Sequence, residues 1–273
     1  MCRLLACWPY TNGAVNGDQG PALTGGGGIV GVALKRDVRP TAASPSIPCH
    51  RCEVRNRTFC AGVEPEELHR LDAITTEVNL KPRQNVFFEG DPAGFVFNVT
   101  RGMIGVSKAL PDGRRQITGF LYPGDFLGAA LHNAYVYDAE AVTGVTLCRF
   151  PRPKLRALFD EFPKLEIHLL SLSANELAKA QDQMLLLGRK SAKERVASFL
   201  LMLAQHAEPR GENGRLLDLP MNRLDIADYL GLSAETVSRT FTTFREEGLI
   251  DYAKRTPVIL RQPELLEAIA ESS

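Results

Sequence analysis

The spacing of hydrophobic and polar residues changes twice along the chain, and each change predicts a different kind of structure. Residues 76–150 contain short apolar runs separated by turn signals, which lie at Glu89–Asp91, Pro111–Gly113 and Pro123–Asp125. Many short strands at even spacing are typical of a small β-barrel or jelly roll. After Pro151 the apolar residues recur at helical spacing. The pattern predicts an α+β protein with an N-terminal barrel followed by helices.

One long helix is predicted from Pro163 to about Leu187. Its apolar and small residues recur at alternating steps of three and four, which is a heptad seam; the seam comprises Leu170, Ser173, Leu177, Ala180, Met184 and Leu187. One face could pack against the barrel of the same chain, but a helix of this length needs a partner along all of it. We therefore expect a homodimer whose interface runs from Leu170 to Met184. Two-fold symmetry suits a palindromic DNA site.

Residues 222–248 predict two short helices joined by a tight turn. Asn222 and Ser233 can cap the two helices, and Gly231 between them suits a left-handed helix end. In the second helix Val237, Phe241 and Phe244 share one face. The opposite face, near the N-terminus of the helix, carries Glu235, Ser238 and Arg239.

Those three side chains suit base reading from a recognition helix in a major groove. Arginine can bind guanine through two hydrogen bonds, glutamate can accept from a cytosine amine, and serine can bond to several bases. An ordinary helical hairpin with a solvated polar face is the alternative. Two short strands are expected at 249–252 and 258–261, around a basic tip, and they favour a winged helix-turn-helix. A basic tip suits a phosphate contact.

Composition narrows the class of protein. The 273 residues allow two modest domains, and the net charge of zero argues against a nonspecific nucleic-acid coat protein. No apolar run reaches the length of a membrane span, and no signal peptide is evident. We therefore expect a cytoplasmic protein without membrane contact. Residues 1–46, with four consecutive glycines, are expected to be a disordered leader.

Three cysteines lie within a dozen residues of each other, at Cys49, Cys52 and Cys60. In the cytoplasm such residues are reduced thiols, metal ligands or redox sensors more often than disulfides. The segment has little apolar content to bury, so a ligand cluster is favoured. Nearby cations are expected to lower the thiol pKa values; they are Arg51, Arg55 and Arg57. The cysteine outside the leader that can supply a fourth ligand is Cys148, so this cysteine loop, residues 47–62, must fold back onto a distant strand.

An enzyme is not expected. The five histidines are scattered along the chain, at positions 50, 69, 132, 168 and 206. Neither a glycine-rich phosphate loop nor a nucleophile elbow is present.

The order of barrel, long helix and winged helix-turn-helix resembles the CRP/FNR superfamily of bacterial transcription regulators, from about Cys49 to the C-terminus. The motifs that carry the resemblance to its oxygen-sensing FNR branch are Gln116–Phe120, Gly124–Asp125, Met184–Leu187, Lys193–Arg195 and Glu235–Arg239. The resemblance implies an oxygen-labile [4Fe–4S] cluster that promotes dimerisation. Its implied ligands are Cys49, Cys52, Cys60 and Cys148. Zinc, or a thiol–disulfide switch, is the alternative use of these cysteines.

The resemblance also implies partners. Glu235, Ser238 and Arg239 inherit base reading at palindromic half-sites of the TTGAT type. RNA polymerase is the implied protein partner, through exposed barrel loops such as 111–115. The related cyclic-nucleotide branch needs a cation for the phosphate, but residues 117–147 contain neither Arg nor Lys. A buried phosphate without an opposite charge is heavily penalised, so no cyclic nucleotide is expected.

These inferences give an expected domain order. The expected segments are a leader at 1–46, the cysteine loop at 47–62, a barrel sensor domain at 63–160, a dimerisation helix at 161–188 and a winged helix-turn-helix at 189–273.

Overall fold

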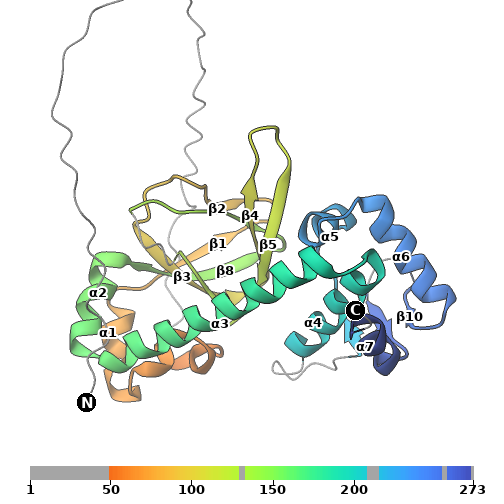
Figure 1. Cartoon of the computed structure of the whole chain (residues 1–273). Coiled ribbons are helices and arrows are strands. Elements are labelled where there is room, and N and C mark those ends of the chain that lie inside the picture. The colour runs from red at the N-terminus through yellow and green to blue at the C-terminus, as the bar shows by residue number, and fades with distance from the viewer. Residues whose placement is uncertain (1–48, 129–132, 208–214, 254–256, 272–273) are drawn as a thin grey trace, which may run out of the picture. The chain divides into compact units, whose positions relative to one another are not determined.

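The computed structural model describes residues 49–128, 133–207, 215–253 and 257–271, all within one unit of the chain, residues 38–273 (Figure 1). The expected leader, with Cys2 and Cys7, lies outside the described residues.

The barrel consists of two four-stranded antiparallel sheets packed face to face. In spatial order the strands are β1 (Thr76–Leu80), β8 (Val145–Pro151), β3 (Phe95–Arg101) and β6 (Phe126–Leu127) in one sheet, and β2 (Asn85–Phe87), β7 (Asp138–Ala141), β4 (Ile104–Ala109) and β5 (Arg115–Leu121) in the other. Val99, Ile104 and Leu147 are fully buried between the sheets. The predicted barrel of short strands is therefore present.

Short helical turns lie on the outside of the first sheet. They are η1 (Cys49–Arg51), η2 (Arg55–Arg57), η3 (Phe59–Gly62), η4 (Pro65–Glu67), α1 (Leu68–Asp72) and, after the barrel, α2 (Arg152–Glu161). Of these, η4 leads directly into α1. Pro65 stands at the first position of η4, where its missing N–H is not needed.

The long helix α3 spans Pro163–Arg189 and is followed by α4, Ala192–Ala207. Near its two ends α3 buries Leu165 and Leu186 against the rest of the chain. Between them the heptad seam faces solvent, with 63% of Leu170, 62% of Leu177 and 69% of Met184 exposed. A row of exposed large apolar side chains marks an interaction surface.

The C-terminal part is a helix-turn-helix with a three-stranded wing. Its elements are β9 (Leu216–Leu217), α5 (Arg223–Leu230), α6 (Ala234–Glu246), β10 (Ile250–Asp251), β11 (Val258–Leu260) and α7 (Pro263–Glu271). The Asn222 side chain accepts from the N–H groups of Leu224 and Asp225, and Gly231 ends α5 at φ 61°. Ser233 caps α6 as expected. The basic wing tip, residues 254–256, lies outside the described residues.

Among the described residues, no helix combines the length and the apolar character that a membrane crossing requires.

Replacing Leu177 with glutamate should break the expected dimer. The change removes about 2 kcal/mol of apolar burial per protomer and brings two like charges together across the seam. The dimer dissociation constant should rise at least about 100-fold, as measured by anaerobic sedimentation. Asn175→Glu places the same charge at another exposed position of α3, away from the seam, and should leave the dimer intact. An unchanged mass for Leu177→Glu would show that the seam is not the interface.

Candidate functional site

The cysteine loop lies in an apolar cluster of its own, apart from the barrel core. Cys49 and Cys60 are buried there beside Phe59, which is fully enclosed and packs edge-on against Phe150 with ring centres 5.2 Å apart. The expectation that this loop has too little apolar content to be buried is therefore wrong. Its few apolar residues fall on the inner side of successive 3-10 turns, where the outer surface of the sheet covers them.

Local hydrogen bonds fix the backbone around two of the cysteines. The Thr58 hydroxyl accepts from the N–H of Cys60 at 3.2 Å and donates to the carbonyl of Arg55 at 3.0 Å. The N–H of Cys49 donates to Oδ1 of Asp72 in α1, 2.6 Å away. Each cysteine is thus held by a polar side chain that its own turn or a neighbouring helix supplies.

Cys148 reaches the same cluster from the sheet. It lies on β8, directly opposite Glu77 of β1 on one side and Asn98 of β3 on the other. The Asn98 Nδ2 donates to Sγ of Cys60 at 3.4 Å, which joins the loop to this row of the sheet. All four cysteines are close enough for their charges to interact. The loop therefore folds back onto the barrel beside Cys148.

The electrostatics of the thiols differ from the sequence expectation. Burial, with a smaller contribution from neighbouring cysteines, raises the pKa of Cys60 and of Cys148 to about 12. The pKa of Cys49 is also raised, first by burial and then by its hydrogen bond to Asp72. The expected lowering by neighbouring arginines is wrong for these three thiols.

The arginines of the loop are engaged elsewhere. Arg55 donates to the carbonyl of Val63 at 3.3 Å, and the side chain of Arg57 lies against the turn at Gly124. Arg51 is exposed. Burial is the largest cause of the raised pKa values at Cys49, Cys60 and Cys148.

The donor set can be compared with the two metal groups expected for it. Among the described residues, no group of three or more Cys, His, Asp or Glu is arranged to hold a single metal ion. Zinc needs its sulfurs at about 2.3 Å from one point. A [4Fe–4S] cluster is held by four thiolates, each on a different iron, and so tolerates sulfurs that are further apart. Cys49, Cys60 and Cys148 lie in or against one apolar cluster, and half-buried Cys52 is close enough to interact with the charges of Cys60 and Cys148. The four thiols therefore fit a [4Fe–4S] group in donor type and number.

The cysteine loop also touches the start of α3. A Cβ added to Gly62 would lie 2.7 Å from backbone atoms of Lys164 and Leu165, so the two backbones are in direct contact. Leu165 is fully buried in the same apolar cluster as Cys60. Lys164 and Glu64 form an exposed ion pair at 2.8 Å across the contact. Figure 1 shows the first turns of α3 beside the cysteine loop. A shift of the loop must therefore move the first turn of α3.

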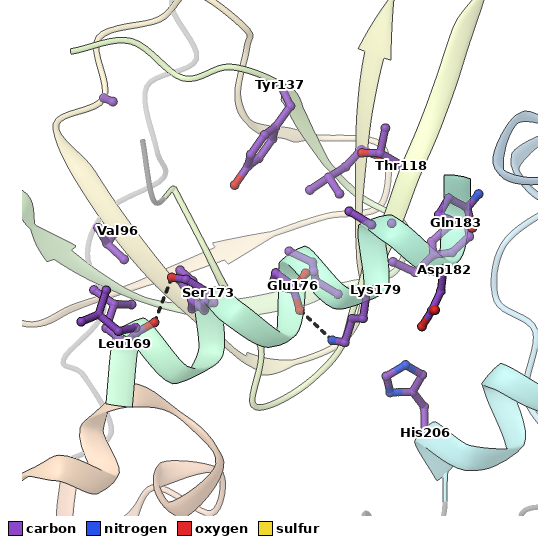
Figure 2. A pocket seen from close by; sticks show the side chains of 18 of the residues that line it. Val96, Thr118, Tyr137, Leu169, Ser173, Glu176, Lys179, Asp182, Gln183 and His206 are labelled. Atoms are coloured by element: carbon purple, nitrogen blue, oxygen red, sulfur yellow. Dashed lines mark hydrogen bonds and ion pairs between the residues drawn. The ribbon is translucent and has the colours of Figure 1, made fainter. Parts of the chain in front are cut away.

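A groove of about 1720 Å³ lies between α3 and the barrel (Figure 2). Ser173, Glu176 and Lys179 line it from α3, and Tyr137 faces them from the barrel. The Lys179 ammonium pairs with Glu176 at 2.6 Å and with Asp125 at 3.8 Å. Its charge is therefore matched by two carboxylates of the same chain.

The expected base-reading residues lie together on one exposed face of α6. The Arg239 guanidinium forms an ion pair with the Glu235 carboxylate one turn earlier. The Ser238 hydroxyl donates to the carbonyl of Ala234 at 2.8 Å. Val237 and Phe241 are fully buried on the opposite face. The helix therefore presents these polar side chains to the outside from a rigid support.

Sequence reasoning missed two polar residues of the cysteine site. Asp72 ends the short helix α1, whose buried residues are Leu68 and Leu71, and Asn98 sits in a strand that reads as apolar. No sequence pattern near Asp72 or Asn98 marks either residue, because each contacts a cysteine that is distant in sequence and is brought close only by folding.

Comparisons with known protein families identify the same two domains that the structure shows. Residues 77–162 match the family model of the cyclic nucleotide-binding domain, and residues 194–269 match that of the Crp-like helix-turn-helix domain.

Individual relatives match over most of their length. The transcriptional activatory protein AadR of Rhodopseudomonas palustris is 40% identical over 77% of this chain and 89% of its own length. The transcriptional activator protein FnrL of Cereibacter sphaeroides is 36% identical over 82% of this chain and 93% of its own. The structure of FixK2 from Bradyrhizobium japonicum has a TM-score of 0.69 at 34% identity, over 73% of this chain and 99% of that one. The predicted fold class is confirmed.

Replacing Gly62 with alanine should destabilise the contact between the cysteine loop and α3. The added methyl group meets backbone atoms, which cannot rotate away, so a loss of about 1–3 kcal/mol in unfolding free energy is expected. Urea unfolding measures it. Gly144→Ala makes the same change where nothing lies within 4 Å and should alter stability by less than about 0.5 kcal/mol. Equal stability of the two variants would contradict the close approach at Gly62.

Proposed function

Because the chain belongs to the Crp/FNR family of transcription regulators, we propose that it is an oxygen-responsive activator whose DNA binding depends on a [4Fe–4S] cluster. Proteins of this family bind DNA and act as dimers. The relatives AadR and FnrL are named as transcriptional activators, which agrees with the prediction that the chain is a regulator and not an enzyme. One observation supports the proposed oxygen response. The cysteine loop packs in a single apolar cluster against both the strand that holds Cys148 and the first turn of α3.

We assign the cluster to four thiolates. They are those of Cys49, Cys52, Cys60 and Cys148. When bound, the cluster supplies an iron–sulfur group that oxygen can destroy. The thiols must lose their protons to become ligands. Since burial raises the pKa of Cys60 and Cys148 to about 12, loading releases protons and should be favoured as pH rises.

The proposed switch acts through packing. The backbone contact at Gly62 makes the position of the α3 first turn depend on the position of the loop. Ordering of the loop would therefore align the exposed seam of α3 with that of a second copy. A coupling of roughly 1–3 kcal/mol is typical of such switches and suffices here.

Zinc is the weaker candidate for the same cysteines, because the described residues include no group arranged around one ion. A thiol–disulfide switch without metal would leave two of the four gathered thiols unexplained.

In the proposed complex the dimer places two α6 helices in successive major grooves of a palindromic site of the TTGAT type. Glu235, Ser238 and Arg239 would read the bases. We infer RNA polymerase as the protein partner; the exposed loop at 111–115, where Asp112 and Arg114 pair at 2.8 Å, is a candidate contact. DNA binding places this function in the cytoplasm.

We infer that the effector is not a cyclic nucleotide. The barrel segment 117–147 supplies no cation, and the groove residues Arg152, Arg156 and Lys190 come from outside this segment. Lys179, which also lines the groove, is already paired with Glu176 and Asp125. An anionic phosphate would have to displace these carboxylates at an energetic cost.

The first experiment is a visible absorption spectrum of the protein purified without oxygen and then exposed to air. A broad brown band that bleaches in air, with about four irons per chain, supports the proposal. A colourless protein with stoichiometric zinc would retain the DNA-binding dimer and replace the sensor. A colourless and metal-free protein would overturn the proposed signal.

Replacing Cys148 with alanine should abolish the anaerobic brown band, because three thiolates cannot complete the ligand set. Iron analysis and absorption measure the loss, and circular dichroism checks that the barrel still folds. Cys2→Ala and Cys7→Ala make the same change at cysteines outside the proposed set and should retain the full band. A full complement of iron in Cys148→Ala would remove this residue from the set.

Replacing Arg239 with alanine should reduce discrimination at one G·C pair of the half-site by roughly 1–3 kcal/mol. Anaerobic binding to matched and singly mutated DNA measures the difference. Arg245→Ala is the control, because this residue lies at the end of α6 and its guanidinium lies over the Tyr252 ring, 5.0 Å from its centre. It should leave sequence discrimination unchanged. A uniform loss across all sequences for Arg239→Ala would indicate a phosphate contact instead.

A further inference from the structure

Asn98 is a polar residue in an apolar place. It lies on β3 with only 2% of its surface exposed, and the alternation of the strand puts it on the same face as Val96, which belongs to the apolar cluster of the cysteine loop. Directly across the sheet from it lie Cys148 on β8 and Phe126 on β6. Side chains directly opposite each other share a face, so Asn98 stands next to Cys148 beneath the loop.

The hydrogen bonds of the Asn98 side-chain amide indicate its role. Among the described residues its side chain makes a single hydrogen bond, from Nδ2 to Sγ of Cys60 at 3.4 Å, while Oδ1 is buried without a partner. A buried amide with an unsatisfied oxygen lowers the stability of the fold. Valine or leucine would fill the position without that cost. The Asn98 amide makes its hydrogen bond to the Cys60 sulfur and not to a backbone group, so we expect the contact with the sulfur to be the reason for a polar residue here.

The other polar side chains at the site are less suited to donate to sulfur. The Asp72 carboxylate is an acceptor when ionised and already receives the N–H of Cys49. The Thr58 hydroxyl directs its proton to the carbonyl of Arg55. Asn98 has N–H donors that point at a cysteine from a rigid strand in the middle of a sheet.

We propose that Asn98 is a positioning residue that donates an N–H to the Cys60 sulfur of the bound cluster and thereby sets how readily oxygen destroys it. This inference rests on the proposed function, because it requires the cluster to be present. A thiol sulfur is a weak acceptor, whereas a ligand sulfur carries negative charge and accepts more strongly. Hydrogen bonds to ligand sulfurs tune the potentials of iron–sulfur clusters.

The direction of the effect follows from charge. An N–H aimed at the sulfur stabilises the more electron-rich state of the cluster, so it raises the reduction potential. Without the donor, the cluster loses an electron more easily and should be oxidised sooner in air. The same bond holds Cys60 in place, so iron should also be retained less firmly once it is removed.

The test uses Asn98→Leu, which keeps the approximate size and removes both the donor and the unsatisfied oxygen. The full-length variant is loaded without oxygen and compared with the unmodified protein. We expect a lower midpoint potential, faster bleaching in air and about ten-fold faster loss of iron to a chelator. The deuterium-sensitive shift of the iron–sulfur stretch in the resonance Raman spectrum should also decrease, which a purely structural role of Asn98 would not produce.

Asn79→Leu is the matched control, because Asn79 lies on β1 of the same sheet with its side chain exposed and bonded to Glu77 at 2.9 Å. It should behave as the unmodified protein in all four measurements. If Asn98→Leu does not fold, Asn98→Val also removes the N–H donors, with a side chain that suits a strand, and it should lower the potential in the same way.

The outcomes separate this inference from the proposed function. If the unmodified protein loads no cluster, both are overturned. If it loads a cluster and the Asn98 variants match it in potential, bleaching and Raman shift, the proposed function stands and the role of Asn98 is overturned. Faster iron loss with an unchanged Raman shift would reduce Asn98 to a packing residue and would also overturn the inference.

Discussion

The contact on which the N-terminal half depends is the packing of the cysteine loop between the sheet and the start of α3. One apolar cluster contains Cys60, Phe150 of β8 and Leu165 of α3, so the loop, the barrel and the helix share a single hydrophobic interior. Gly62 allows the backbone of the loop to touch that of α3. Because interiors of this kind are close-packed, the loop cannot change its conformation without disturbing the helix that carries the exposed seam.

The DNA-binding half could be predicted from sequence almost residue by residue, because its signals are local. The caps at Asn222 and Ser233 and the left-handed glycine at 231 act within a few residues of their own position. The fold keeps the face assignment of α6, with Val237 inside and Arg239 outside. The apolar repeat of α3 is also a local signal, and the structure leaves its members Leu170, Leu177 and Met184 exposed.

The sensor site was predictable only in part. The spacing of the cysteines predicts a ligand site, but their burial and raised pKa values depend on contacts between distant segments. Asn98 meets Cys60 across 38 positions of sequence, and no pattern within β3 points to it. The strands β6 and β9 have two residues each, too few to show an alternation. What sequence does not show here is long-range packing, which decides the electrostatics of the thiols.

Those electrostatics bear on how such a sensor can be reversible. Burial favours the neutral thiol at Cys49, Cys60 and Cys148, so the chain is stable with these residues protonated and apolar. Holding a cluster requires the same residues as thiolates, and the binding energy must offset their desolvation. In the proposed switch, cysteines that lose the cluster can take up protons and remain in the apolar interior, so the loop would have a folded state in both conditions.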